Sequence, residues 1–372
     1  MTAPTGLTRD GRRSASHGAG DPGPGSGPLG PALAAARVHR AGLLGWTSFF
    51  AVAACALVWL YSVGQRAKEL DTAFCIMSGH EPGVPECPDG DGFSAPYAYS
   101  WMLELAQTSI TFLPFAVAVY VGGALVARDF ERGTAGLAWT QSVTPARWLA
   151  TKLAVPGLLT GAGTTVLILL QRWVWTSGAQ GPVRFWWEQQ AFHAGGPVGL
   201  AFTALGLATG ALAAVLTRRT LPAAGISVAA LAAVYSALGS FWHLLWPKVR
   251  LTGTDASGLS DRAGEKFDVG MITDSGTRAG SFCDGKAVQA SLDKCLAKYD
   301  GRDVFAVAHP ESHFWPLQFA EAGIVLALAA VVTVVAFRLL PASGPAKSAT
   351  GGGTPTVSGT EAATVPHMET SR

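Results

Sequence analysis

Two short segments carry residue types whose spacing could support chemistry. The first, GSFCDGKA from Gly280 to Ala287, has the glycines and the lysine, Lys286, of a loop that binds nucleotide phosphates. Ala287 stands where such a loop carries the Ser or Thr hydroxyl that holds magnesium, and no convincing apolar strand precedes the segment. We attribute this match to chance, and we expect the chain not to hydrolyse ATP itself.

The second segment is HPESH, in which His309 and His313 lie four residues apart with Glu311 between them. Imidazole and carboxylate groups are zinc ligands, but a zinc site needs further ligands and regular geometry. Pro310 instead favours a helix start that leads into the aromatic residues beyond it. No cluster of histidines and acids is expected at one membrane depth, so we predict no metal site and no catalytic residues.

A third segment, residues 127–152, is charged although it lies between two apolar runs. Arg128 to Arg132 carry both signs of charge within about one helical turn, and Gly133 and Thr134 interrupt the pattern. Residues 135–143 can form a short helix with an apolar group around Trp139. A solvated loop is the simpler alternative, but it would have no need of these aromatic residues.

The elements that position these segments are mostly apolar. Of 372 residues, 49% are hydrophobic and only 14% are charged, whereas soluble domains carry about 25% charged residues. Apolar runs close to the roughly 20 residues that cross a bilayer alternate with polar loops. We therefore predict an all-α membrane protein with six transmembrane helices, a short cytoplasmic helix and a large extracellular loop. The predicted spans are residues 41–63, 103–127, 153–170, 197–217, 221–246 and 315–339.

The two ends of the chain differ in composition from this transmembrane domain, which we place at residues 37–340. Residues 1–36 and 341–372 are rich in small and polar residues, and we predict that both are disordered tails. The first apolar run begins too far along the chain for a cleaved leader. The predicted outer loops are residues 64–102, 171–196 and 247–314.

The Lys and Arg residues of short loops set the orientation, because cytoplasmic loops carry an excess of them. A cytoplasmic N-terminus places nine of them inside, namely Arg37, Arg40, Arg128, Arg132, Arg147, Lys152, Arg218, Arg219 and Arg338. Outside then lie Arg66, Lys68, Arg172, Arg184, Lys248 and Arg250. Six spans place both termini in the cytoplasm. Arg greatly outnumbers Lys, which is typical of a GC-rich bacterial genome, so we predict a bacterial plasma membrane location.

Four of the five cysteines fall in the predicted outer loops, where an oxidising environment favours disulfides. Cys75 and Cys87 lie in the first loop, and Cys283 and Cys295 lie in the last loop with the same spacing. One disulfide in each loop is the preferred reading. Bridges between the loops and free thiols remain alternatives, since four cysteines allow three connectivities.

Polar residues inside the spans are a further set of candidates, because charge is costly in a bilayer and is often functional there. Glu104 and Gln107 enter the second span, and Gln318 and Glu321 enter the sixth. These four residues either line a substrate pathway, pair with each other or with an Arg, or reach interfacial water. Separately, the small-residue pairs Gly157 with Gly161 and Gly206 with Gly210 allow close helix packing.

The segment from residue 127 to 152 resembles the cytoplasmic loop between the second and third spans of type 2 ABC exporter permeases. The resemblance rests on ARDFERGT, Ala127 to Thr134, on HPESHFWPLQFAEAGI, His309 to Ile324, and on residues that follow the first motif: Gln141, Ser142, Thr144, Pro145, Arg147, Trp148 and Lys152. The six spans and the large outer loop before the sixth also fit. Asp129 stands where family members usually have Glu, and residues 247–314 form a larger loop than simple members have.

The resemblance implies that the chain forms a homodimer or pairs with a similar permease, above two separate ATP-binding subunits. ATP and Mg²⁺ would be held by those subunits, and this chain would bind no cofactor and catalyse no reaction. The quoted loop would be the coupling helix, with Gly133 allowing it to turn and Trp139 entering an apolar pocket of the partner. The residues implied at this contact are Arg128, Asp129, Phe130, Glu131, Arg132, Gly133, Thr134 and Trp139.

We therefore expect the permease subunit of an ATP-driven exporter, surrounded by membrane lipid and without a nucleic-acid partner. The alternative is a membrane-anchored sensor or binding protein whose disulfide-rich outer loop is the functional part. Six spans are more than an anchor needs. The substrate is not indicated, because lipids, drugs and peptides would all suit an apolar cavity.

Overall fold

The protein is described by a computed structural model. It describes residues 40–69, 95–140, 143–177, 185–253, 264–273, 276, 278–280, 297–298 and 301–340. The tails predicted at residues 1–36 and 341–372 lie outside these ranges.

Six helices within the described residues are long and apolar enough to cross a membrane. Each overlaps one predicted span, and most extend further. The third extends furthest: it was predicted at residues 153–170 and covers Pro145–Ser177. The helix continues through Arg147, Lys152 and Arg172, whose charges bounded the predicted apolar run. The six helical segments are Ala41–Gln65, Tyr99–Glu131, Pro145–Ser177, Pro197–Thr217, Thr220–Leu244 and Glu311–Arg338.

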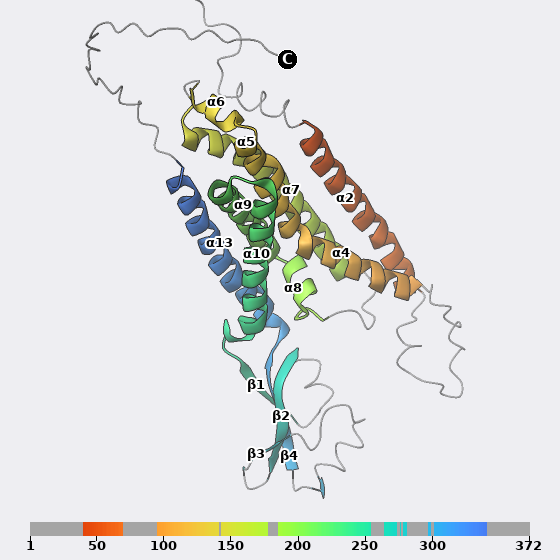
Figure 1. Cartoon of the computed structure of the whole chain (residues 1–372). Coiled ribbons are helices and arrows are strands. Elements are labelled where there is room, and N and C mark those ends of the chain that lie inside the picture. Colours follow the sequence, from red (N-terminus) through yellow and green to blue (C-terminus); the bar gives the residue numbers. More distant parts are fainter. Residues whose placement is uncertain are drawn as a thin grey trace, which may run out of the picture. The chain divides into compact units, whose positions relative to one another are not determined.

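The elements divide into long helices, short helices and one sheet (Figure 1). The long helices are α2 (Arg40–Glu69), α4 (Ala95–Val119), α7 (Pro145–Ser177), α9 (Pro197–Thr217), α10 (Thr220–Phe241) and α13 (Phe314–Arg338). The short ones are the π-helix η1 (Tyr120–Ala127), α5 (Arg128–Glu131), α6 (Thr134–Thr140), α8 (Gln189–Ala194) and the 3₁₀ helices η2 (Trp242–Leu244) and η3 (Glu311–His313). The strands are β1 (Val249–Gly253), β2 (Glu265–Thr273), β3 (Arg278–Gly280) and β4 (Gly301–His309).

The all-α prediction is wrong for residues 247–314, which contain a four-stranded antiparallel sheet in the order β1-β4-β2-β3. β1 pairs with β4 from Val249 opposite Ala308 to Gly253 opposite Val304. The central strand β4 carries the buried run Val304 to Ala306. This run of β-branched, aromatic and small residues is far too short to span a bilayer, and it suits a strand.

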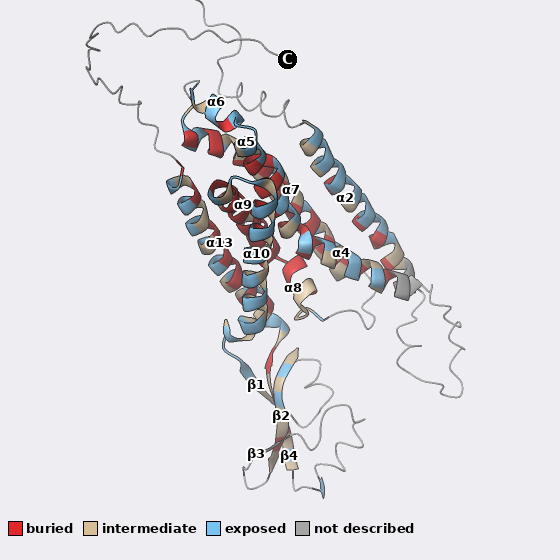
Figure 2. Cartoon of the chain, viewed as in Figure 1, coloured by how far each residue is buried: buried red, intermediate tan, exposed pale blue. Residues whose placement is uncertain are grey.

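Helix α9 forms the centre of the helical part and packs against α4, η1, α10 and α13. In the most apolar stretch of 18 residues in its span, 78% of the residues are buried, against 17% in the corresponding stretches of α2 and α10, and Figure 2 shows most of α9 in the colour for buried residues. Two glycines make the close approach possible. A Cβ atom on Gly210 would lie 2.6 Å from the carbonyl oxygen of Ala118, and one on Gly206 would overlap the carbonyl oxygen of Pro114.

The two predicted glycine pairs therefore differ. Backbone of α4 and η1 lies directly against Gly206 and Gly210, whereas a Cβ atom on Gly161 would meet nothing within 4 Å and one on Gly157 would meet only a leucine side chain at 3.5 Å. The Gly206 and Gly210 pair sets the distance between two central helices.

We predict that Gly210→Ala lowers the stability of the purified protein by roughly 1–3 kcal/mol, because the new methyl group must displace backbone. Gly161→Ala is the matched control and should be neutral or slightly stabilising, since Ala favours a helix over Gly by roughly 0.5–1 kcal/mol. The measurement is the melting temperature of both variants in the same detergent. Equal melting temperatures for the two would contradict this account of the packing.

Candidate functional site

The segment from Arg128 to Thr140, which contains α5 and α6, forms a tight helical corner at one end of the long helices (Figure 1). The π-helix η1 leads directly into α5. Gly133 then turns the chain with a φ of 71°, a left-handed conformation that glycine adopts without strain. Its N–H donates to the carbonyl oxygen of Phe130 at 3.1 Å, and the Thr134 hydroxyl donates to that of Asp129 at 3.2 Å.

Two of the predicted acids in this segment bind other helices of the same chain. Asp129 forms an ion pair with Lys152 of α7, with 2.8 Å between Oδ2 and Nζ. Glu131 accepts hydrogen bonds from the backbone N–H of Thr220 at 2.7 Å and from its hydroxyl at 3.2 Å. A carboxylate at the first N–H groups of a helix satisfies unpaired donors and stabilises the helix dipole. Glu131 therefore caps α10, and the segment is tied to α7 and α10 as well as to α4.

The aromatic residues of the segment pack inward. The rings of Phe130, Trp139 and Trp148 lie mutually edge-to-face, with centroids 5.5 to 6.1 Å apart. The guanidinium of Arg218 lies 5.7 Å from the centroid of Phe130. In this chain Trp139 thus contacts Trp148 of α7, so its predicted place in a partner's pocket stays a prediction.

The outward face of the segment consists of other residues. Leu137 of α6 is 64% exposed, which makes it the large apolar side chain that the segment presents to its surroundings. Arg128 and Arg132 of the same segment are also exposed. Sequence reasoning placed Leu137 in an apolar group with Trp139 but did not separate the two, because the helix of seven residues is too short to show a face by periodicity.

The predicted pathway residues of the sixth span lie at the junction of α8, α9 and α13. Gln318 is fully buried. Its Oε1 accepts a hydrogen bond from the backbone N–H of Val198 at 3.2 Å, and its Nε2 donates to the carbonyl oxygen of Phe192. One side chain of α13 thus satisfies the end of α8 and the start of α9, where backbone groups lack helical partners.

Glu321, one turn further along α13, is 1% exposed and lies 3.0 Å from Nε2 of His193. His193 belongs to α8 and is surrounded by the rings of Phe192, Phe202 and Tyr235. The sequence placed His193 in an outer loop, and no local pattern indicates that this loop folds back between helices. The pair joins α8 to α13 inside the protein, where removal of one partner would leave the other buried without a hydrogen bond.

The two predicted pathway residues of the second span occupy different environments on α4. Glu104 is exposed, whereas Gln107 is fully buried. Neither Nε2 nor Oε1 of Gln107 has a hydrogen-bond partner among the described residues. The four predicted residues therefore do not share one surface in this chain, and a pathway role for them remains untested.

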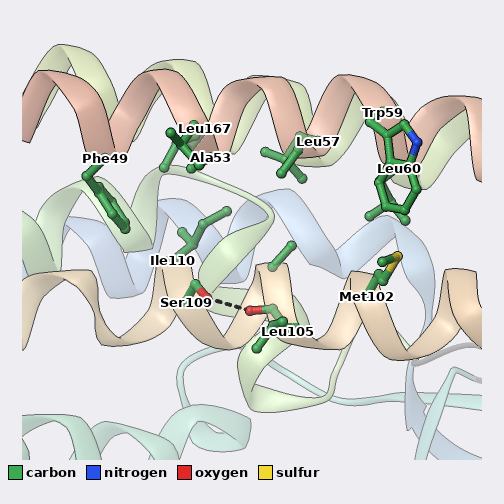
Figure 3. Close-up of a pocket in the computed structure, with 13 residues that line it drawn as sticks. Phe49, Ala53, Leu57, Trp59, Leu60, Met102, Leu105, Ser109, Ile110 and Leu167 are labelled. Carbon is green, nitrogen blue, oxygen red and sulfur yellow. Dashed lines mark hydrogen bonds between the residues drawn. The ribbon is translucent and has the colours of Figure 1, made fainter.

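An apolar pocket of about 300 Å³ lies between α2, α4 and α7 (Figure 3). Phe49, Leu57 and Trp59 of α2 face Met102 and Ile110 of α4 across it. Ser109 supplies its hydroxyl, which already donates to the carbonyl oxygen of Leu105 at 2.7 Å. The pocket therefore offers contacts to apolar groups and leaves a charged ligand unsatisfied.

The remaining predicted sites differ in whether they are described. Four cysteines and one segment lie outside the described residues: Cys75, Cys87, Cys283, Cys295 and residues 281–287. Within the described residues, Cys55 is a free, exposed cysteine. Nδ1 of His309 lies 3.0 Å from Nδ1 of His313, and Nε2 of His309 lies 3.1 Å from the carbonyl oxygen of His243. Burial lowers the pKa of His309, so its ring is neutral and donates through Nε2. No three potential ligands among the described residues are placed to hold a metal.

We predict that Glu321→Ala lowers stability by roughly 1–3 kcal/mol, because it leaves His193 buried without an acceptor. Glu321→Gln keeps a hydrogen-bonding group beside His193, so this variant should lose less stability than Glu321→Ala. Glu104→Ala is the control at an exposed acid, with an expected effect within about 0.5 kcal/mol. Melting temperatures in detergent test this order, and a Glu321→Ala variant as stable as Glu104→Ala would contradict it.

A comparison with family models matches residues 48–242 to the model described as "ABC-2 membrane transporter related". The matched range is more than half of the 372 residues and contains α4 to α10, including the α5–α6 segment. No curated protein and no solved structure matches the chain. The chain is an ABC-2 type permease and belongs to the ABC-2 membrane transporter related family.

Proposed function

We propose that this chain is the membrane-spanning subunit of an ATP-driven exporter and that it docks on a separate ATP-binding subunit through its α5–α6 segment. The family supports a permease subunit of an ABC transporter in a multi-pass membrane protein. The docking, the direction of transport and the cytoplasmic position of both termini are the parts that we add.

The observation that carries the proposal is how the α5–α6 segment is connected. It follows η1 without a break, its Asp129 binds Lys152 of α7, and its Glu131 caps α10. A force on the segment therefore acts on three membrane helices at once. Exposed Leu137 gives a partner an apolar contact, and exposed Arg128 and Arg132 of the same segment add positive charge.

The proposed mechanism needs no chemistry in this chain. Closure of the ATP-binding subunits moves the α5–α6 segment, and the segment moves the ends of α4, α7 and α10. ATP and Mg²⁺ are held by the partner subunit. Such a movement shifts the permease between two conformations only if the partner binds the segment with different free energy in each.

We further propose that two such permeases pair in the membrane, as a homodimer or with a similar chain. In the most apolar 18 residues of α2 and of α10 only 17% are buried, so these helices present most of their surface to lipid or to a second permease. The sensor alternative gains no support, because the family match covers the second to fourth spans and most of the first and fifth, and it ends before the sheet.

The test is co-purification of the tagged full-length chain from its native membranes, with stoichiometric partners identified by mass spectrometry. We predict that an ATP-binding cassette protein is captured and that Leu137→Asp reduces the capture at least tenfold, because a charge replaces the apolar contact. Leu244→Asp is the matched control, since Leu244 is 66% exposed in η2, outside the α5–α6 segment.

The controls also separate docking from folding. Both variants should elute as single peaks with unchanged melting temperature, since both positions are exposed. Capture that Leu137→Asp and Leu244→Asp reduce equally would refute docking at α6. A chain that purifies without any ATP-binding protein would refute the proposed function.

A further inference from the structure

A second cavity, of about 360 Å³, lies where α7 ends and α13 begins. Its volume is within the range of pockets that hold small ligands. The cavity has a buried floor and an exposed rim. The floor includes Gln171, Ala191, Gly195 and Phe314, and the rim includes Thr176, Glu311, Ser312 and Trp315.

A single cation lines this cavity among the described residues. The guanidinium carbon of Arg172 lies 5.0 Å from the ring centroid of Phe314 and 4.6 Å from that of Trp315. Its Nη1 makes one long hydrogen bond of 3.4 Å, to the carbonyl oxygen of Gly195. The two aromatic rings hold the guanidinium in place, and most of its five N–H donors remain available to an anion.

Two further donors at the cavity are buried and have no partner among the described residues. Gln171 is fully buried, and neither its Nε2 nor its Oε1 makes a hydrogen bond. The indole Nε1 of Trp186 is likewise buried and unpaired. A buried polar group without a partner costs free energy. Gln171 and Trp186 both line the cavity, so a small rotation of either side chain would turn a donor toward a ligand that carries hydrogen-bond acceptors.

The chemistry of the cavity is therefore dipolar. The donors of Arg172, Trp186 and Gln171 suit the oxygens of a phosphate, because a guanidinium binds phosphate through parallel hydrogen bonds. Glu311 on the rim suits an amine, and the ring of Trp175, which also lines the cavity, attracts a cation. A phosphate and an amine held a few bonds apart constitute the headgroup of an aminophospholipid.

The surface next to the cavity suits the rest of such a lipid. Trp315, Phe319 and Leu326 lie along one face of α13 and are 43%, 63% and 49% exposed, and the rings of Trp315 and Phe319 stack with centroids 5.8 Å apart. This apolar face leads from the rim along a membrane-spanning helix, where acyl chains lie. A small soluble phosphate ester would leave this face unused.

We propose that this cavity binds the headgroup of a phospholipid of the phosphatidylethanolamine type, with the phosphate at Arg172 and the amine at Glu311. The site lies outside the α5–α6 segment and requires no ATP-binding partner. The binding site is therefore tested on the purified chain alone, and it stands or falls independently of the proposed docking.

The experiment is native mass spectrometry of the detergent-purified full chain, titrated with dioleoylphosphatidylethanolamine. We expect Arg172→Gln to weaken binding about tenfold or more, because it removes the charge-assisted hydrogen bonds to phosphate. Trp186→Phe should weaken it by a smaller factor while keeping the ring, so it tests the site even if Arg172→Gln does not fold. Arg250→Gln is the matched control, since Arg250 also lies 5.0 Å from a ring, that of Phe305, but on the sheet.

Three comparison ligands identify what the site recognises. Dioleoylglycerol, which lacks both the phosphate and the amine, should bind at least tenfold more weakly. Dioleoylphosphatidylglycerol, which keeps the phosphate and lacks the amine, should bind several-fold more weakly. Binding of phosphatidylglycerol as tight as that of phosphatidylethanolamine would overturn the assignment of the amine to Glu311. Equal binding by the wild type, Arg172→Gln and Trp186→Phe would overturn the site. Displacement of the lipid by equimolar glycerophosphoethanolamine would show that a soluble phosphate ester is the ligand, which overturns the lipid assignment.

Discussion

The interior of a bilayer offers no water to the end of a helix, and this molecule meets that constraint with side chains from distant helices. Gln318 of α13 does this for the end of α8 and the start of α9, where it is fully buried. At the exposed end of the helices, Glu131 of α5 caps the start of α10 in a similar way. The Tyr99 hydroxyl donates to the carbonyl oxygen of Val174 at 3.1 Å. Each of these hydrogen bonds satisfies a backbone group near the end of a helix, and each also fixes the position of one element against another. The positions of α8, of the α5–α6 segment and of both cavities follow from them.

The spans were predictable because their signal is local. A run of apolar residues of bilayer length requires no knowledge of its neighbours, and all six runs are helices. The sheet had a local signal too. Residues 304–308 show no alternation of apolar and polar side chains and include two β-branched residues, which is typical of a central strand. The many polar residues elsewhere in residues 247–314 nevertheless led to a loop prediction.

The long-range contacts were not predictable, because nothing near Glu131 in the sequence indicates that it meets Thr220, and nothing near Glu321 indicates His193. Sequence reasoning selected Gln318, Glu321 and Glu131 as unusual, and the structure gives each a structural partner within the chain. The free-energy cost of removing a polar side chain from water identifies a buried polar residue as important. It does not say whether the residue joins two helices or faces a ligand, since both uses offset the same desolvation. Gln171 differs from the others only because its partner is not found among the described residues.

The cap that Glu131 places on α10 also constrains the order of biosynthesis. Glu131 leaves the ribosome 89 residues before Thr220 does. Until that later residue emerges, the carboxylate of Glu131 has no helix start to bind, and α7, α8 and α9 must be threaded into the membrane first. The α5–α6 corner therefore acquires its final form only when the fifth span is inserted. A nascent chain that stalls before residue 220 would carry an unfinished α5–α6 corner, and under the proposed docking an incomplete permease would therefore not assemble with its partner.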